Sequence, residues 1–123
     1  MSTPTVATVT VIPADVVTGE LAGQSDPPPG VRFDNGASVT DRIVHTAPDG
    51  APTTLVWNST VGSTVYEQPL AHPERGFVVS GKGRFVDADG SEHPVSAGTA
   101  FVLPEGWTGR FEVDETVRKV IFV

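Results

Sequence analysis

The sequence contains no cysteine. This absence excludes disulfide bonds, thiolate zinc sites and cysteine nucleophiles, and it fits a protein of the cytoplasm, where we expect this chain to be. No apolar run approaches the roughly 20 residues that a membrane span needs. The first residues, MSTPTVATVTV, have neither a basic segment nor a continuous apolar core. We therefore expect no signal peptide.

Basic residues are also scarce. The chain has 8 lysines and arginines against 15 aspartates and glutamates, which gives a formal net charge of -7 at pH 7. Such a chain repels phosphate backbones and anionic lipid. We therefore predict that it binds neither nucleic acid nor a membrane surface.

Sustained helical periodicity is missing as well, whereas turn-forming residues are abundant, with 13 glycines and 11 prolines in 123 residues. From position 53 onward, short β-branched and aromatic runs follow one another with turn signals between them, which is typical of a β-sandwich or barrel. We predict one all-β domain, with residues 53–123 as an antiparallel barrel or jelly roll. Residues 1–52 should form an N-terminal arm and the first strands, packed on that barrel.

Three local predictions accompany this fold. The β-branched runs near Val6–Ile12 and Ser38–His45 should be the strands of the first third. The sequence Gly81-Lys82-Gly83 should be a hairpin turn that joins two separate strands. The final residues are apolar on both alternating faces, so the last strand should lie in the middle of a sheet.

Two glycine-framed patterns follow a known spacing. In the first, Gly62 is followed after five residues by Gln68-x-Leu70, then after three by Glu74 and after six by Gly81. The first motif of the cupin barrel has this spacing, with two histidines at the positions of Gln68 and Leu70. The frame resembles a cupin, but the two imidazole ligands are replaced.

The second pattern continues the resemblance. Gly98 is followed after five residues by Pro104-x-Gly106 and after two more by Gly109. The second cupin motif has this frame and ends in a histidine, where this chain has Gly109. The resemblance implies the cupin fold, and it leaves the metal-binding positions without their usual side chains.

A narrower resemblance covers Leu55 to Val123. The stretch AGTAFVLPEGWTGRFEVDETVRKVIFV is similar to the small cupins of the (S)-ureidoglycine aminohydrolase type. In that family a glutamate, two histidines and a glutamine occupy the motif positions, and a lysine near the end of the domain contacts the substrate. The resemblance therefore implies a substrate role for Lys119, although Lys119 could equally be a surface cation paired with Glu115 or Asp114. Small cupins of this type imply a homodimer.

Glu74 is the strongest candidate of the site. An inward carboxylate could bind a polar ligand or act as a general acid or base, with its pKa raised by the barrel wall. It could equally be a solvated carboxylate or a partner of Arg75 or Arg84. Tyr66 could orient a ligand or donate a proton beside Glu74, or simply fill the core.

A metal site is the weaker alternative. A divalent ion such as zinc, manganese, nickel or iron wants three or four good ligands, and Gln68 offers only a neutral amide oxygen. His72 could rebuild a site with Glu74, although prolines on both sides make its direction unpredictable. We therefore expect no cofactor, with a metal at His72 and Glu74 as the exception.

Two functions remain open at this point. In the first, the barrel binds a small polar metabolite through Gln68, Glu74, Tyr66, Trp57 and Lys119 around a degenerate metal site. If Lys119 points inward beside Glu74, an anionic or zwitterionic metabolite would suit the pair. In the second, the protein is an isomerase, lyase, cyclase or aminohydrolase-like enzyme that uses Glu74 and Tyr66.

Overall fold

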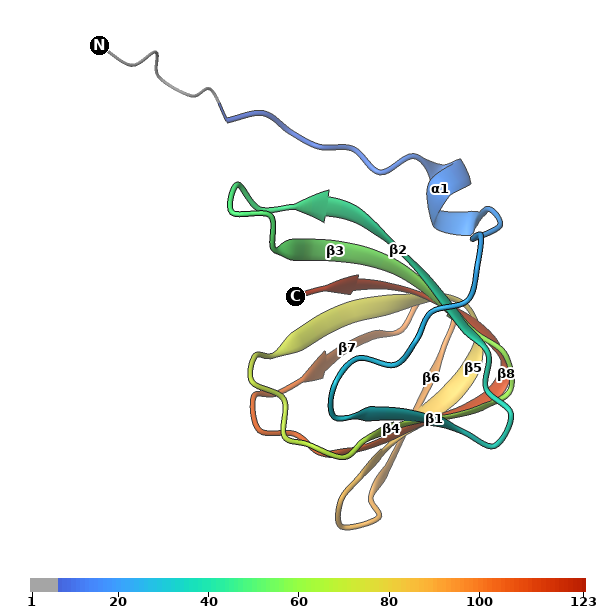
Figure 1. Ribbon diagram of the computed structural model, residues 1–123. Helices are drawn as coiled ribbons and strands as arrows, with labels where there is room; N and C mark the ends of the chain where they lie inside the picture. Colours follow the sequence, from blue (N-terminus) through green and yellow to red (C-terminus); the bar gives the residue numbers. More distant parts are fainter. Residues whose placement is uncertain (1–6) are drawn as a thin grey trace.

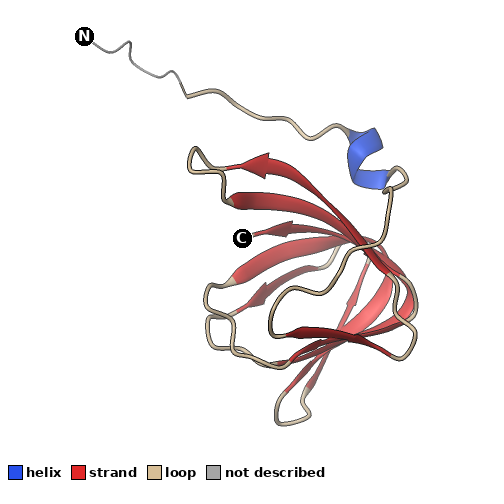
Figure 2. Cartoon of the chain, viewed as in Figure 1, coloured by secondary structure: helices blue, strands red, loops and turns tan. Residues whose placement is uncertain are grey.

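The computed structural model describes residues 7–123, and nearly all of its regular structure is β-strand (Figures 1 and 2). One short helix precedes eight strands, which are all paired antiparallel. In chain order the elements are α1 (Ala14–Thr18), β1 (Val31–Asp34), β2 (Val39–Thr46), β3 (Pro52–Ser59), β4 (Gly62–Tyr66), β5 (Glu74–Asp87), β6 (Glu92–Ser96), β7 (Ala100–Leu103) and β8 (Gly109–Phe122).

Two long strands, β5 and β8, hold the architecture together. They pair with each other along their whole length. On its other edge, β8 pairs first with β4 and then with β3, while β5 pairs with β7 near its start and with β6 near its end. The result is a sheet that curls over on itself into a barrel (Figure 1). One wall contains β2, β3 and β7, and the other contains β1, β4 and β6.

The prediction that the last strand is central is therefore confirmed, since β8 has partners on both edges. Its side chains alternate as expected. Val117, Lys119 and Ile121 are buried on one face, while Phe122 on the other face is 44% exposed. Val120, on the same face as Phe122, is also buried, so both faces of this part of the strand are largely covered.

The prediction of a hairpin at Gly81-Lys82-Gly83 is wrong. These residues lie inside the continuous strand β5, where the pairing register with β8 shifts. Gly81 has a φ of 88°, and a Cβ there would collide with the carbonyl oxygen of Thr116. The segment is a β-bulge that bends β5 from one wall of the barrel to the other.

The first third differs from expectation in two places. Residues 7–13 form no strand, and the single turn of α1 follows Pro13; Val6 lies outside the described residues. The short strand β1 was not predicted, while β2 confirms the strand expected near Ser38–His45. Among residues 7–123, no helix is long and apolar enough to cross a membrane.

The arm makes specific contacts with the barrel. The guanidinium of Arg118 donates hydrogen bonds to the carbonyl oxygens of Val17 and Gly19, at 2.9 and 2.8 Å. Further along, the backbone N–H of Ser25 donates to the carbonyl oxygen of Val39 at 2.8 Å, and its hydroxyl donates to Asp41 at 2.8 Å. These contacts bring the segment around Ser25 to the rim of the barrel.

Candidate functional site

Glu74 is the first residue of β5, and its side chain turns into the barrel. The carboxylate oxygen Oε2 is buried and has no hydrogen-bond partner among the described residues. Burial raises the pKa of Glu74, and the positive charge of Lys119 opposes that rise. The alternative of a pair with Arg84 does not occur, because Arg84 bonds to Glu92 and Asp114 on the outside. Glu74 therefore turns one carboxylate oxygen, Oε2, into the barrel without a hydrogen-bond partner among residues 7–123.

Lys119 lies in the middle of β8 and is completely buried, at 0% exposure. Its pairing with Trp57 on β3 and Val78 on β5 places all three side chains on the inner face. The Nζ atom lies 4.0 Å from the ring centroid of Trp57 and 4.2 Å from that of Phe111. No described residue accepts a hydrogen bond from it. The aromatic faces are thus its main stabilising contacts.

The surroundings of Lys119 shift its acidity strongly. Burial lowers the pKa of Lys119 from its ordinary value of 10.5 to about 8, and the negative charge of Glu74 limits the fall. The phenyl rings of Phe85 and Phe101, each with its centroid 5.3 Å from Nζ, complete a box of four aromatic rings. A substantial fraction of this amine is therefore neutral near neutral pH.

A cavity of about 180 Å³ opens beside these groups. Trp57, Thr64, Tyr66 and Glu74 line its inner part. The hydroxyl oxygen of Thr64 is buried and, like Oε2 of Glu74, finds no hydrogen-bond partner within the described part of the chain. Buried polar atoms are normally bonded to something. The cavity is a place where a guest could satisfy them.

The outer part of the same cavity is acidic. Asp26 from the arm and Asp41 from β2 line it, together with Pro28 and Val31. One oxygen of Asp41 accepts the hydroxyl of Ser25 at 2.8 Å. Sequence reasoning did not identify these two aspartates or Thr64, because the residues that line the cavity are brought together from strands and loops far apart in the chain.

Tyr66 ends β4 and lies against Trp107, with the ring centroids 5.2 Å apart in an edge-on arrangement. Burial raises the pKa of Tyr66 well above its ordinary value, and the charge of Glu74 raises it further. The indole Nε1 of Trp107 donates a hydrogen bond to Asp87 at 2.9 Å. This bond fixes the indole across the end of the barrel.

The positions that carry ligands in cupin motifs do not assemble a metal site. Gln68 is exposed and lies against Gly30, outside the lining of the cavity. Leu70 packs on the hydrophobic core. A Cβ at Gly109 would lie 2.2 Å from the carbonyl oxygen of Val86 and 2.6 Å from Cζ2 of Trp107, so the paired strand and the indole together leave no space for a side chain there. The glycines and the proline of the two motifs are retained, whereas the positions that carry metal ligands in other cupins hold different residues.

His72 does not join Glu74 in a cluster. His72 is exposed, whereas Glu74 faces the cavity. Among residues 7–123, no group of three or more histidines, aspartates or glutamates is close enough to hold a metal ion. The residues present therefore do not fit a divalent metal, and we derive no reaction step through one.

A second, larger hollow of about 440 Å³ lies on the β6–β7 side of the barrel. Its walls are Phe85, Phe101 and Trp107, and Asp87 and His93 stand at its polar end. Nε2 of His93 lies 2.8 Å from Asp87. The bonds to Trp107 and His93 lower the pKa of Asp87. Phe85 and Phe101 belong both to this hollow and to the box around Lys119.

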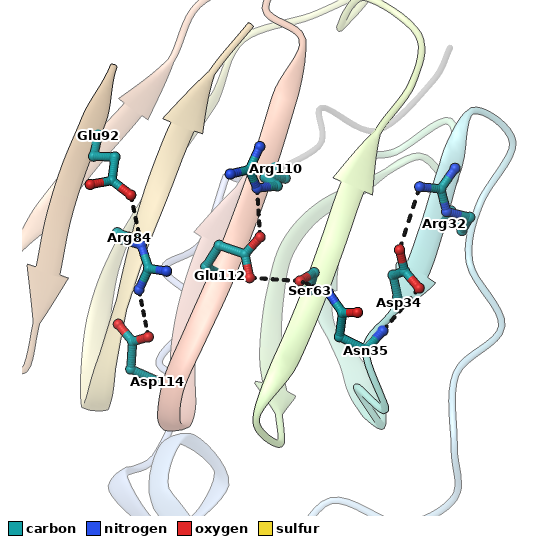
Figure 3. A network of polar contacts seen from close by, with 9 residues as sticks. All are labelled: Arg32, Asp34, Asn35, Ser63, Arg84, Glu92, Arg110, Glu112 and Asp114. Atoms are coloured by element: carbon teal, nitrogen blue, oxygen red, sulfur yellow. Dashed lines mark hydrogen bonds and ion pairs between the residues drawn. The ribbon is translucent and has the colours of Figure 1, made fainter. Parts of the chain in front are cut away.

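The outer surface of the wall that contains β1, β4 and β6 is polar. Figure 3 shows a ladder of charged side chains that crosses neighbouring strands. Arg84 bonds to Glu92 and Asp114 at 3.0 and 2.6 Å, and Arg110 bonds to Glu112 at 2.6 Å. These exposed ion pairs keep this face polar and hydrated, and they contribute little to the stability of the fold.

With this geometry established, the family can be stated. The sequence model of the EutQ-like cupin domain matches residues 46–120, which is more than half of the chain. The protein therefore belongs to the EutQ-like cupin domain family, and the predicted cupin barrel is confirmed. The specific aminohydrolase family is not shown by this match. No curated relative matches the chain.

Solved structures support the same fold. The EutQ protein of Clostridium difficile is 18% identical, with a TM-score of 0.60 over 70% of this chain and 67% of that one. A DUF861 family protein of unknown function from Pseudomonas syringae is 20% identical, with a TM-score of 0.64 over 84% of this chain and 44% of its own. The chain thus spans less than half of the Pseudomonas protein.

The polyketide cyclase RemF from Streptomyces resistomycificus is a third neighbour. It is 20% identical, with a TM-score of 0.57 over 93% of this chain and 78% of that one. At these identities the likeness shows the cupin fold alone. Activity has to be argued from the side chains that this chain places in its barrel.

Proposed function

We propose that this cupin barrel binds a small polar metabolite in the cavity beside Glu74. The observation that carries the proposal is a pair of buried polar atoms on this cavity that lack hydrogen-bond partners among residues 7–123: Oγ1 of Thr64 and Oε2 of Glu74. A buried unsatisfied group costs about 1–3 kcal/mol. A guest that completes these bonds recovers that cost as binding free energy.

The charge of the cavity selects the guest. Asp26, Asp41 and Glu74 all line it, so a purely anionic compound meets repulsion. A neutral or zwitterionic compound with hydroxyl or amino groups can donate hydrogen bonds to these carboxylates. The volume of about 180 Å³ equals roughly six water molecules at about 30 Å³ each, so the guest is small.

Binding can be followed at the two tryptophans of the chain. The indole N–H signals of the ¹⁵N-labelled protein are recorded during titration with ethanolamine, glycerol, L-serine and acetate. We expect the Trp57 signal to move with the first three compounds and to move least with acetate. A Trp57 signal that responds only to acetate, or to none of the four, contradicts the proposal.

Glu74→Gln is the decisive variant for this test. It keeps the shape of the side chain and removes the charge, so binding of an amine or polyol should weaken about tenfold, the effect of one charged hydrogen bond. Glu115→Gln is the matched control, because Glu115 is exposed and lies 3.9 Å from Lys82. Equal binding by the two variants would remove Glu74 from the site.

An enzyme is the second candidate, and the environment of Glu74 and Tyr66 favours it. A carboxyl group whose pKa is raised by burial holds its proton to a higher pH than an exposed glutamate and can exchange it with a bound guest, and Tyr66 lines the same cavity. Isomerase, lyase, cyclase or aminohydrolase-like chemistry would use this pair. The test is turnover by the wild type that both Glu74→Gln and Tyr66→Phe abolish, while binding by Tyr66→Phe persists.

We also propose a cytoplasmic homodimer. The outer surface of the wall that contains β2, β3 and β7 carries Phe77, Val102 and Phe122, which are 38%, 63% and 44% exposed. Their strand pairing places them on one face around the exposed Arg75, which pairs with both Val102 and Phe122, whereas the other wall carries the charged ladder. An apolar patch of this kind favours a partner surface. Analytical ultracentrifugation should show a dimer that Phe122→Asp converts to monomer, and a monomeric wild type overturns this.

A further inference from the structure

The environment of Lys119 differs from that of an ordinary surface lysine. The chain contains only two lysines, Lys82 and Lys119. Lys82 is on the surface, with 65% of its side chain exposed, and lies 3.9 Å from Glu115. Lys119 is fully buried, touches aromatic rings and has no hydrogen-bond partner in the described part of the chain. Apolar burial without a paired anion activates a lysine as a nucleophile.

We propose that the amine of Lys119 forms an imine with a small, uncharged aldehyde or ketone that enters the barrel cavity. This inference rests on the proposed function, because the carbonyl compound occupies the same cavity. It goes further in assigning a covalent role to Lys119, which then acts as a nucleophile rather than as a fixed positive charge.

The chemistry is balanced without an external reagent. The lone pair of the neutral amine attacks the carbonyl carbon, and the C=O bond becomes a C–O single bond in a carbinolamine. The nitrogen loses its extra proton and the oxygen gains one. A further proton on that oxygen allows it to leave as water while the C=N bond forms, which gives a protonated imine. Glu74 lines the cavity and its pKa is raised, so its carboxyl group can deliver that proton, and its carboxylate can then take the N–H proton of the protonated imine to leave the neutral imine.

Access to the amine passes Trp57. The Trp57 ring lies 4.0 Å from Nζ, and the same side chain lines the cavity with Glu74. One aromatic ring therefore separates the amine from the cavity. The lysine stem has four rotatable bonds, and rotation of its last bonds can carry Nζ past the ring edge. On the other side, Phe85 and Phe101 separate the amine from the larger hollow.

The amine of Lys119 is partly neutral, as attack on a carbonyl carbon requires. With a pKa of about 8, roughly a quarter of Lys119 is neutral at pH 7.5, against about a thousandth of an ordinary lysine. Glu74 is the ionisable group whose charge acts on Lys119. The other side chains around it are Trp57, Phe111 and the two phenyl rings at 5.3 Å, and none of these titrates.

The surroundings also define the carbonyl compound. The acidic lining of the cavity disfavours 2-oxo acids, whose carboxylate would approach Asp26, Asp41 and Glu74. The aromatic walls tolerate an apolar body, and Thr64 can bond to one hydroxyl group. Glycolaldehyde and acetaldehyde match this description, while pyruvate carries the disfavoured charge.

The test is reductive trapping on the full-length chain. Wild type is incubated at pH 7.5 with glycolaldehyde, acetaldehyde or pyruvate and sodium cyanoborohydride, and peptides are mapped by mass spectrometry. We expect a mass increase equal to the aldehyde less one oxygen atom on the peptide that contains Lys119. Its rate should exceed that at Lys82 about tenfold or more, following the fractions of free amine. Trapping by pyruvate should be slower.

Two variants show which lysine carries the adduct. Lys82→Arg removes the other lysine amine, so any side-chain adduct then lies on Lys119. Lys119→Arg keeps a cation in place but is not expected to form the adduct, and circular dichroism checks its fold. Raising the pH through 8 should speed labelling of Lys119 as the free amine accumulates. Equal rates at Lys82 and Lys119, or labelling of Lys82 alone, would overturn the proposal.

The failure of this inference is distinguishable from failure of the proposed function. If glycerol moves the Trp57 indole signal but neither aldehyde labels Lys119, the cavity binds metabolites and the covalent role is wrong. If glycerol, ethanolamine and the aldehydes all leave both Trp57 and Lys119 unchanged, both proposals fail. Labelling of Lys119 that excess glycerol slows would support both together.

Discussion

Replacing Lys119 with methionine tests the energetic consequence of burying this amine. The pKa of Lys119 falls from its ordinary value of 10.5 to about 8 when the chain folds. The charged amine therefore makes folding less favourable at every pH at which the unfolded chain holds this proton more tightly than the folded protein. At about 1.4 kcal/mol per pH unit, the difference corresponds to about 3 kcal/mol at pH 7. Contacts of the cation with Trp57 and Phe111 return about 1–2 kcal/mol of this. Lys119→Met should therefore stabilise the protein by about 1–2 kcal/mol at pH 7.

The pH dependence follows from the sign of the shift. The folded state gives up the Lys119 proton near pH 8, while the unfolded chain holds it until about 10.5. Between these values the unfolded state binds more protons, so the stability of the wild type rises with pH in that window. The Lys119→Met variant has no titrating group at this position, so this contribution to the rise of stability with pH is absent from it. The difference between the two proteins should shrink by about 1 kcal/mol from pH 7 to pH 9.5, because the cation–ring contacts that lessen the shift also lessen its loss.

Urea denaturation of both proteins at pH 7 and pH 9.5, with the free energy of unfolding extrapolated to water, measures these differences. Lys82→Met is the control, because Lys82 is an exposed lysine. Its unfolding free energy should differ little from that of the wild type at either pH. A Lys119→Met protein that is less stable than wild type at pH 7, or a difference that stays constant between the two pH values, would refute the reasoning.

Three other perturbations have defined outcomes. Gly109→Ala places a Cβ 2.2 Å from the carbonyl oxygen of Val86 and 2.6 Å from the Trp107 ring, so the free energy of unfolding should fall by about 1–3 kcal/mol in urea; an unchanged value would mean that neither the Val86 backbone nor the indole closes this space. Arg118→Met removes the bonds to Val17 and Gly19, so amide exchange should accelerate in the arm but not in β5; unchanged exchange would mean that other contacts hold the arm. EDTA should leave the melting temperature of tag-free protein unchanged, because the described residues hold no metal cluster; a lower melting temperature would reveal a bound ion.

The glycine frame was the most informative part of the sequence for the fold. Gly98 and Gly106 have φ values of 87° and 84°, as tight turns between strands require. The same signal misled at Gly81, which has a φ of 88° but lies in a β-bulge. A positive φ predicts that the chain departs from a regular strand. Whether it turns back or continues depends on the partner strand, which the local sequence does not reveal.

Alternation was equally informative inside a strand and failed where the strand ended. It placed Lys119 correctly on the face of Val117 and Ile121. It also predicted that Gln68 would follow Tyr66 into the cavity, but β4 ends at Tyr66 and Gln68 is exposed. Side-chain direction follows parity only while the backbone remains extended.

The box around Lys119 was beyond the reach of local patterns. Its rings come from β3, β5, β7 and β8, and strand pairing across the barrel brings them together. The sequence could nevertheless have hinted at it, since Trp57, Phe85 and Phe111 each lie in an apolar strand run. Which ring meets which charge depends on the register of non-local strands, and a shift of one residue would reverse it.

The altered ligand positions and the unusual acidity of Glu74 and Lys119 have a common physical origin. Trp107 takes the space that a side chain at position 109 would need, and it packs edge-on against Tyr66 and Phe85. An aromatic interior of low polarity disfavours charge on any group that faces it. The packing that displaces metal ligands therefore also pushes the carboxyl group towards its protonated form and the amine towards its neutral form. A proton donor on the cavity and a free amine against the Trp57 ring that lines it are the elements of carbonyl chemistry that protein side chains can supply themselves.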